Sequence, residues 1–368
     1  MQSLPDSSLQ TLVALSLLGR GVDTFAARAL KALAFPDGCL IDSFDPAPFI
    51  EPLGRALEVP ADIWRDRMTR AQQVARQALA QGDRAGLVVL PVSSPLYPAL
   101  LRQIVDPPVV LWVKGRLDGF NQRSIAVVGS RNGTPAGLLT SKRFGHDLAA
   151  AGISVVSGLA RGVDGAAHRG ALDASGHTVA VLGCGANVVY PRVHAGLATD
   201  IVERGALISE FPPGAAALPE HFPLRNRIIS GLSRAVVVVE AHLQSGSLIT
   251  ARMALEQGRD VMVVPGNVAS GCYRGSHNLI KDGARLVETV KDILDEVGWP
   301  QPEQSVAPDK DFEISELDSL MRRGETVGLD ELVARTGRSV TGLLADLLDL
   351  ELAGKVAKVA GGDFVRLD

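Results

Sequence analysis

Short apolar runs alternate with amphipathic stretches between residues 109 and 295 of this chain. The runs are rich in Val, Ile and Leu, end at glycine or polar residues, and lack the alternating pattern of a half-exposed strand. Such runs are typical of strands that are buried on both faces, as in a parallel sheet covered by helices. The pattern therefore predicts an α/β domain over residues 86–295, with a doubly wound, mostly parallel sheet. The predicted strands are 109–115, 124–130, 153–160, 178–185, 206–211, 235–241 and 260–266.

Two smaller modules, residues 1–85 and 311–368, flank this domain and have the apolar periodicity of helices. We interpret the first as a helical packing module with a turn at Gly19-Arg20-Gly21. The alternative is a helix hairpin whose N–H groups bind duplex phosphates. Residues 91–108 contain several prolines and predict an extended connector. Residues 296–310 are polar and contain prolines, which predicts a linker.

The C-terminal module has the layout of a small winged helix, three helices followed by a hairpin. A winged helix that reads DNA needs cationic donors on the helix that enters the groove. The corresponding helix here, residues 339–352, carries Asp346, Asp349 and Glu351 but no Lys or Arg. This module is therefore predicted to contact protein rather than DNA.

Composition restricts the class of protein. The chain has 368 residues, of which 46% are hydrophobic, enough for two or three globular domains. The apolar run at residues 9–18 is interrupted by polar residues and follows no basic leader, so neither a signal peptide nor a membrane span is expected. Cys39, Cys184 and Cys272 lack the spacing of a disulfide framework or a metal site, which favours a reducing cytoplasm. No metal or other cofactor is predicted.

The net charge of −4 conceals an uneven distribution of charge along the chain. Residues 1–120 contain 12 basic and 12 acidic side chains, residues 121–286 contain 16 and 11, and residues 287–368 contain 9 and 18. In the central segment 14 of the basic residues are arginines, whose guanidinium groups suit phosphate contact and base stacking. The charge of the central segment is compatible with a nucleic-acid partner.

Three predicted strands end in turns of small, polar or cationic residues, namely Gly129-Ser130-Arg131, Gly183-Cys184-Gly185 and Ser245-Gly246-Ser247. In a parallel sheet these turns share the carboxyl edge, where helix N-termini present N–H groups and glycine lets an anion approach the backbone. The chain is therefore predicted to bind phosphate. An NAD site is not favoured, because the first turn lacks the G-x-G-x-x-G spacing and no acidic residue follows the next strand at Ser157-Gly158. No P-loop lysine follows any strand.

Three further segments place arginine beside glycine or an aromatic ring. Gly158 and Gly162 frame Arg161, which predicts a guanidinium at the sheet edge. Asp164 and His168 share a helix face, and for this pair a structural hydrogen-bonding role is favoured over catalysis or metal binding. The other segments contain Tyr190 with Arg192, and Phe222 with Arg225, Asn226 and Arg227, the latter group immediately before an apolar helix.

A family resemblance follows from these motifs taken in order. DPPVVLWVKG, VGSR, SGLARGVDGAAHRGAL, YPR, ALISEFPPG, FPLRNRIISGLSRAVVVVEA, SGSLITARMALEQGRDVMVVPG and GSHNLIKDGA resemble the DNA-processing protein A (DprA/Smf) family over about residues 91–290. The three-part layout matches that family too. Two positions depart from its pattern: His194 stands where Asn is common, at a predicted turn, and Arg192 where Lys is frequent.

The resemblance implies an extended Rossmann-like domain that binds single-stranded DNA, and duplex DNA more weakly, between a SAM-like or helix-hairpin-helix-like N-terminal domain and a winged helix. It also implies a homodimer that protects incoming DNA and loads the RecA recombinase during natural transformation, without catalysis. The residues expected to contact DNA are Gly129, Ser130, Arg131, Gly158, Arg161, Gly162, Gly183, Gly185, Tyr190, Arg192, Phe222, Arg225, Asn226, Arg227, Ser245, Gly246 and Ser247. The dimer surface is expected at His277, Leu279, Ile280 and Leu286.

The alternative function is an enzyme that cleaves nucleoside monophosphates from their bases, because the predicted sheet edge also resembles such enzymes. It needs a carboxylate at the sugar, for which Asp164, Glu210 and Glu240 are candidates. Helix capping, or pairing with Arg227, explains Glu210 and Glu240 equally well.

Overall fold

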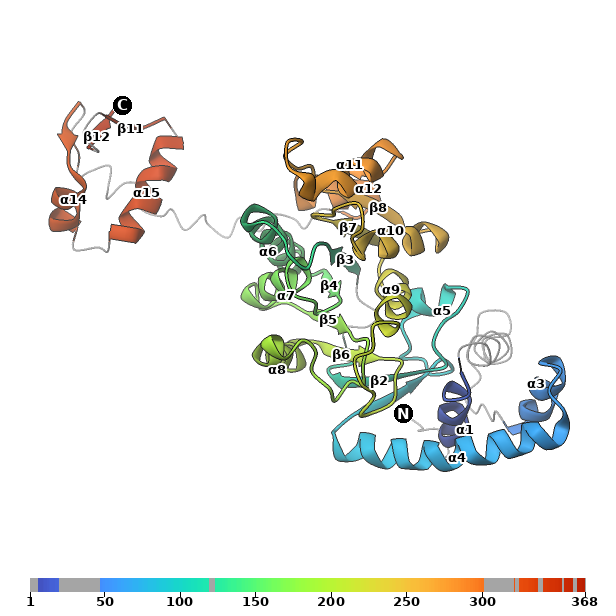
Figure 1. Cartoon of the computed structure of the whole chain (residues 1–368). Coiled ribbons are helices and arrows are strands. Elements are labelled where there is room, and N and C mark those ends of the chain that lie inside the picture. Colours follow the sequence, from blue (N-terminus) through green and yellow to red (C-terminus); the bar gives the residue numbers. More distant parts are fainter. Residues whose placement is uncertain are drawn as a thin grey trace. The chain divides into compact units, whose positions relative to one another are not determined.

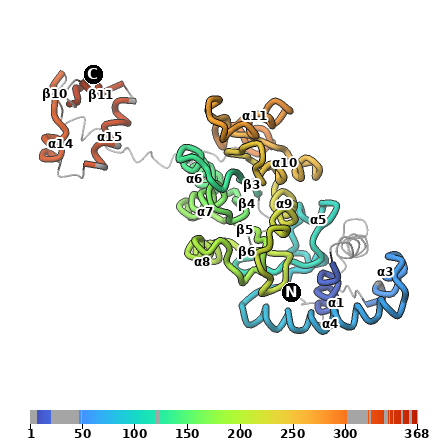
Figure 2. Tube along the Cα trace, in the orientation of Figure 1, coloured from blue at the N-terminus to red at the C-terminus, as the bar shows by residue number. Residues whose placement is uncertain are grey.

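The computed structural model describes residues 6–19, 47–118, 123–300, 321, 324–336, 340–352, 354–359 and 363–367. The chain divides into two compact units, Met1–Gln301 and Pro302–Asp368 (Figure 1). The Cα trace in Figure 2 follows the chain through each unit.

The first unit contains a sheet of nine strands among the described residues, in the order β1-β2-β6-β5-β4-β3-β7-β8-β9. All neighbouring pairs from β6 to β9 in this order are parallel, whereas β1 and β2, and β2 and β6, pair antiparallel. The predicted α/β fold with a mostly parallel sheet is confirmed. The strands are β1 Val88–Pro91, β2 Val110–Gly115, β3 Ser124–Val128, β4 Ser154–Ser157, β5 Thr178–Val181, β6 Ala206–Ser209, β7 Ala235–Val238, β8 Asp260–Val263 and β9 Arg285–Leu286.

Helices cover both faces of this sheet, because successive side chains of each strand point to opposite sides. In β3, Ile125 and Val127 pack in one buried cluster with residues of α6, α7 and α12, whereas Ala126 and Val128 join another with α9 and α10. Figure 1 shows α6 and α7 on one side of the strands and α9 and α10 on the other. The helices are α6 Pro135–Ala150, α7 Val163–Asp173, α8 Ala195–Arg204, α9 His221–Gly231, α10 Ser247–Glu256, α11 Arg274–Lys281 and α12 Val290–Val297.

The strand order reverses between β3 and β7. The chain proceeds from β3 through β4 and β5 to β6 in one direction, and from β7 through β8 to β9 in the other. In open α/β sheets, ligands bind in the crevice at the carboxyl ends of the strands beside such a reversal. The turns after β3, β4 and β7 lie at this position.

The N-terminal helices α1 (Asp6–Ser16), α3 (Ile50–Ala56) and α4 (Ala61–Arg84) share a buried cluster with strands β1 and β2. The buried face of α4 repeats every three or four residues, as an amphipathic helix requires; it consists of Trp64, Met68, Ala71, Ala75, Ala78 and Gly82. The predicted turn at Gly19-Arg20-Gly21 lies mostly outside the described residues. No helix in the described ranges combines the length and apolarity needed to cross a membrane.

Three local predictions differ from the structure. The connector at residues 91–108 contains a short helix, α5 Ala99–Gln103, after Pro98. The edge strand β1 was not predicted, because its four residues are too few for a periodic signal. Helix α9 begins at His221 and not after the Arg-Asn-Arg segment, so these cations lie within the helix. The direction in which each of these two arginines points therefore depends on its position in α9.

The second unit contains, in the described part, a three-stranded antiparallel sheet in the order β10-β12-β11 with helices α14 and α15. Leu332, Leu343, Leu347 and Phe364 belong to its buried core. This arrangement agrees with the predicted winged helix, whose first helix lies outside the described residues. The elements are β10 Thr326–Val327, α14 Leu329–Thr336, α15 Val340–Leu352, β11 Val356–Lys358 and β12 Phe364–Arg366.

Candidate nucleic-acid interface

A cavity of about 540 Å³ opens at the carboxyl edge of the sheet, where the strand order reverses. Its volume falls within the range of small-molecule sites, so the sheet edge that was predicted to bind phosphate is hollowed. A second, smaller hollow of about 40 Å³ shares some of its walls. The predicted residues that line the larger cavity are Gly129, Ser130, Arg131, Tyr190, Phe222, Arg225, Asn226, Ser245, Gly246 and Ser247. Gly158 and Arg161 line the smaller hollow.

Arg225 forms a buried cationic wall of the cavity. Its side chain is 4% exposed, and its Nη1 donates to the carbonyl oxygen of Val181 at 2.6 Å. Gly158 makes room for it, because a Cβ there would lie 1.9 Å from Nη1. Burial lowers the pKa of Arg225 to about 10, an effect that Asp164 opposes, so the guanidinium stays charged at neutral pH. Its Nε has no acceptor among the described residues.

Asp164 balances part of this charge and shapes the neighbouring loop. Its Oδ2 accepts from the N–H groups of Gly158 at 3.1 Å and Ala160 at 3.4 Å. Burial raises the pKa of Asp164, and Arg225 and these two N–H groups oppose that rise. The carboxylate therefore contacts the loop backbone.

Arg131 provides an exposed cation at the cavity mouth. Its guanidinium carbon lies 5.3 Å from the ring centroid of Phe222, and that of Arg225 lies 6.0 Å from the same ring. Tyr190 stands 5.4 Å from Phe222 between ring centroids and is 46% exposed. The mouth thus combines an exposed cation with an accessible aromatic ring.

The backbone of the first turn is used within the protein. Ser130 N–H donates to the carbonyl oxygen of Glu240 at 2.8 Å, and Thr134 N–H donates to the Glu240 carboxylate at 3.0 Å. The Thr134 hydroxyl also accepts from Gly137 N–H as the N-cap of α6. The expected free N–H groups at the start of α6 are therefore partly satisfied, and the positive character of the site depends more on arginine side chains.

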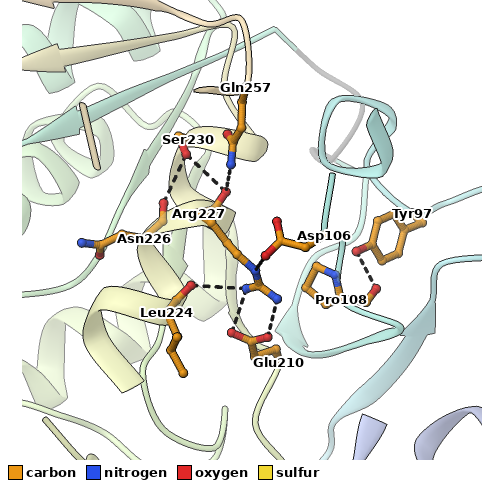
Figure 3. A network of polar contacts seen from close by, with 9 residues as sticks. All are labelled: Tyr97, Asp106, Pro108, Glu210, Leu224, Asn226, Arg227, Ser230 and Gln257. Carbon is orange, nitrogen blue, oxygen red and sulfur yellow. Dashed lines mark hydrogen bonds and ion pairs between the residues drawn. The ribbon is translucent and has the colours of Figure 1, made fainter. Parts of the chain in front are cut away.

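Arg227 corrects a prediction, because the structure does not place it at the cavity. Its guanidinium is 3% exposed, donates to Glu210 at 2.8 and 2.7 Å and to Asp106 at 3.0 Å, and also contacts the carbonyl oxygen of Leu224 (Figure 3). Gln257 donates to the Arg227 carbonyl oxygen. Residues two apart on a helix point in widely different directions, so Arg225 faces the cavity and Arg227 a structural ion network.

The three carboxylates considered for catalysis have defined surroundings. Glu210 pairs with Arg227 and Glu240 caps α6, as their structural interpretations predicted. Asp164 lines the cavity, whereas Glu210 and Glu240 do not. His168 also has the predicted structural role: it is buried, its Nδ1 lies 2.7 Å from Thr178 Oγ1, and burial lowers its pKa to about 3.

Apart from Arg227, four predicted contact residues line neither hollow. Gly162 has φ +80° and lies against Ser130, where a Cβ would be 2.2 Å from the carbonyl oxygen. Gly183 packs beside Phe222, and Gly185 beside Pro212. The fourth is Arg192, an exposed residue of the 3₁₀ turn Arg192–His194. The sequence did not single out the cavity residues Asn132, His242, Gln244 and Thr250, although they flank the predicted turns.

The residues of the predicted dimer surface lie at the far end of the sheet. Leu279 and Ile280 are partly buried against the core, and Leu286 on β9 is 43% exposed. His277 Nε2 lies 3.2 Å from the carbonyl oxygen of Gly266. Self-association through this surface stays a prediction.

Comparisons with known proteins agree with these features. A family model described as DNA recombination-mediator protein A matches residues 88–298, and one described as DprA winged helix domain matches residues 315–362. Protein Smf of Escherichia coli (strain K12) is 44% identical over 289 residues, 76% of this chain and 77% of that protein. The DNA processing protein DprA of Bacillus subtilis (strain 168) is 40% identical over 231 residues, 62% of this chain and 76% of that protein.

Two solved structures are similar to this chain. DNA processing protein A from Streptococcus pneumoniae has a TM-score of 0.67 at 32% identity, covering 80% of this chain and 99% of that one. The Helicobacter pylori DNA processing protein A, described for its single-stranded DNA binding mode, has a TM-score of 0.52 at 25% identity, covering 57% and 95%. The Rossmann-like fold and the C-terminal winged helix are thereby confirmed.

Proposed function

Since this chain belongs to the DNA recombination-mediator protein A family, whose members include DNA processing proteins, we propose that its sheet-edge cavity holds a segment of single-stranded DNA. The observation that carries the proposal is the pair of guanidinium groups that line the cavity, Arg225 buried in its wall and Arg131 exposed at its mouth. Burying a cation is costly unless a partner compensates for it. A phosphate oxygen is such a partner, and the solved relative from Helicobacter pylori is described as binding single-stranded DNA.

The shape of the site favours a single strand over a duplex. The larger cavity has polar walls and the accessible Tyr190 ring at its mouth, which suit a phosphate together with an unpaired base. In a duplex the bases are stacked and paired, so they reach neither the ring nor the cavity without being unstacked. Duplex DNA therefore binds more weakly, through phosphate contacts alone.

The finer role that we propose is that of a recombination mediator. Bound as a homodimer in the cytoplasm, the protein protects an incoming single strand and promotes loading of the RecA recombinase during natural transformation. The family description as a recombination mediator supports this role. DNA binding in the proposal requires no chemistry at the cavity.

A binding titration tests the DNA part of the proposal. Fluorescence anisotropy of a labelled thymidine oligonucleotide and of the corresponding duplex is measured with the full chain. We expect saturable, salt-sensitive binding with at least about tenfold preference for the single strand. Equal affinity for both, or no binding, contradicts the proposal.

A separate assay tests the mediator role. RecA is added to a single strand that is already coated with a single-strand binding protein, and DNA-dependent ATP hydrolysis reports filament formation. We expect the lag before hydrolysis to shorten when the full chain is present. If wild-type protein that binds the strand leaves the lag unchanged, the loading role is contradicted and DNA binding is not.

A further inference from the structure

The loop between β4 and α7, residues 158–162, borders both hollows and has an unusual backbone. Ala160 lines both of them, and Arg161 lines the smaller one. Leu159 has φ +55° and is fully buried. A left-handed backbone is disfavoured for a bulky residue without local support. Contacts from outside the loop must therefore hold it in this conformation.

Three contacts hold the loop. The Asp164 carboxylate accepts from the N–H groups on either side of Leu159. The Leu159 side chain packs in a buried cluster with Leu182 and Leu197. The third contact comes from a distant segment, because Nδ1 of His194 lies 3.0 Å from the Leu159 carbonyl oxygen. A carbonyl oxygen only accepts, which assigns a proton to Nδ1.

His194 follows closely, in the chain, two residues that line the smaller hollow opposite this loop. It ends the 3₁₀ turn Arg192–His194, which directly follows the wall residues Tyr190 and Pro191. The histidine is 4% exposed, and its ring lies against Gly165 in α7, where a Cβ would be 2.6 Å from Cε1. One buried imidazole therefore joins the Tyr190 segment to the loop that carries Arg161.

We propose that His194 is a positioning residue for DNA binding, which fixes the backbone of residues 158–162 against the Tyr190 segment. The inference rests on the proposed function of the cavity. Arg161 and Tyr190 occupy the two walls that the Nδ1 hydrogen bond joins. Loss of that bond lets the walls separate, so the two side chains lose their common orientation toward a bound strand.

The chemistry of the imidazole suggests a set of matched variants. The side-chain amide of Asn has nearly the reach of imidazole Nδ1, whereas that of Gln has the reach of Nε2. His194→Asn therefore keeps a donor for the Leu159 carbonyl oxygen, and His194→Gln and His194→Leu remove it. His168→Leu is the control, because His168 is also buried with a bonded Nδ1, but its partner is Thr178 and not the loop of residues 158–162.

The test measures affinity for a labelled thymidine oligonucleotide with full-length variants, at a temperature where circular dichroism shows them folded. We expect about tenfold weaker binding by His194→Leu and His194→Gln, less than about twofold change for His194→Asn, and wild-type affinity for His168→Leu. In a background lacking both the Arg161 and Tyr190 side chains, His194→Leu should have little further effect.

The outcomes are distinct. Wild-type affinity in the Gln or Leu variant overturns the inference, as does a loss in the Asn variant equal to that in Gln. An undiminished loss in the background without Arg161 and Tyr190 side chains also overturns it, because His194 then acts through something else. If wild-type protein itself does not bind the oligonucleotide, the proposed function of the cavity fails instead.

Discussion

Replacement of Arg227 by methionine separates two roles for this residue, a phosphate contact and a buried structural ion pair. The structure favours the second, because the guanidinium is 3% exposed and its partners Asp106 and Glu210 have side chains 23% and 13% exposed. Removing one partner of a buried pair costs roughly 3–5 kcal/mol. Since water reaches both carboxylates in part, we expect the lower end of that range, about 3 kcal/mol.

The free energy of unfolding is measured by urea titration followed by tryptophan fluorescence. Trp64, Trp112 and Trp299 all precede residue 302, so the signal reports on the first unit alone. Arg234→Met is the matched control. Arg234 pairs with Asp260, both side chains are 36–37% exposed, and its loss should cost less than about 1 kcal/mol.

The DNA affinity of the same variants completes the test. Oligonucleotide binding is measured without urea, at a temperature where Arg227→Met is folded. The salt dependence of its affinity should match that of the wild type, because no phosphate contact has been removed. An unchanged free energy of unfolding, together with a reduced salt dependence, would refute the buried network and return Arg227 to the DNA interface.

Three further predictions concern other parts of the chain. Truncation after Gly298 removes a segment rich in acidic side chains, so single-strand affinity should stay within a few-fold in anisotropy titrations; a loss of tenfold or more, about 1.4 kcal/mol, in folded dimeric protein speaks against this. Sedimentation of Ile280→Glu should show a folded monomer. An intact dimer would show that the dimer interface does not include the predicted surface. Burial lowers the pKa of His168 from 6.5 to about 3, so the unfolded state binds more protons in that window and stability should fall as the pH drops below about 6.5. In His168→Leu the urea midpoint should depend less on pH there, and an equal dependence would contradict the assignment.

Much of the fold was predictable because its signal is local. The Val and Ile runs at residues 124–128 and 235–238 identify strands buried on both faces, and the turns after them line the cavity at the sheet edge. The role of Glu240 in helix capping was also one of the interpretations that the local sequence allowed. A carboxylate directly after a buried strand meets the N-terminus of the helix that follows the neighbouring strand.

The distinction between Arg225 and Arg227 was not predictable from local sequence. Both arginines precede an apolar run, and the start of α9 at His221 is marked by no N-cap side chain. Their different roles depend on partners distant in sequence. Arg227 pairs with Asp106 and Glu210, whereas Arg225 donates to the carbonyl oxygen of Val181. The contact of His194 with Leu159 is likewise a product of tertiary structure, since 35 residues separate them.

The salt dependence of single-strand affinity in Arg131→Ala tests the central claim most directly, because Arg131 is the exposed cation at the mouth of the cavity. Affinity for a labelled oligonucleotide is measured over a series of salt concentrations for the wild type, Arg131→Ala and the control Arg234→Ala. We expect weaker binding by Arg131→Ala and a slope of log affinity against log salt that is shallower by about 0.7. Affinity and slope equal to the wild type in Arg131→Ala would place the DNA elsewhere on the protein and contradict the account.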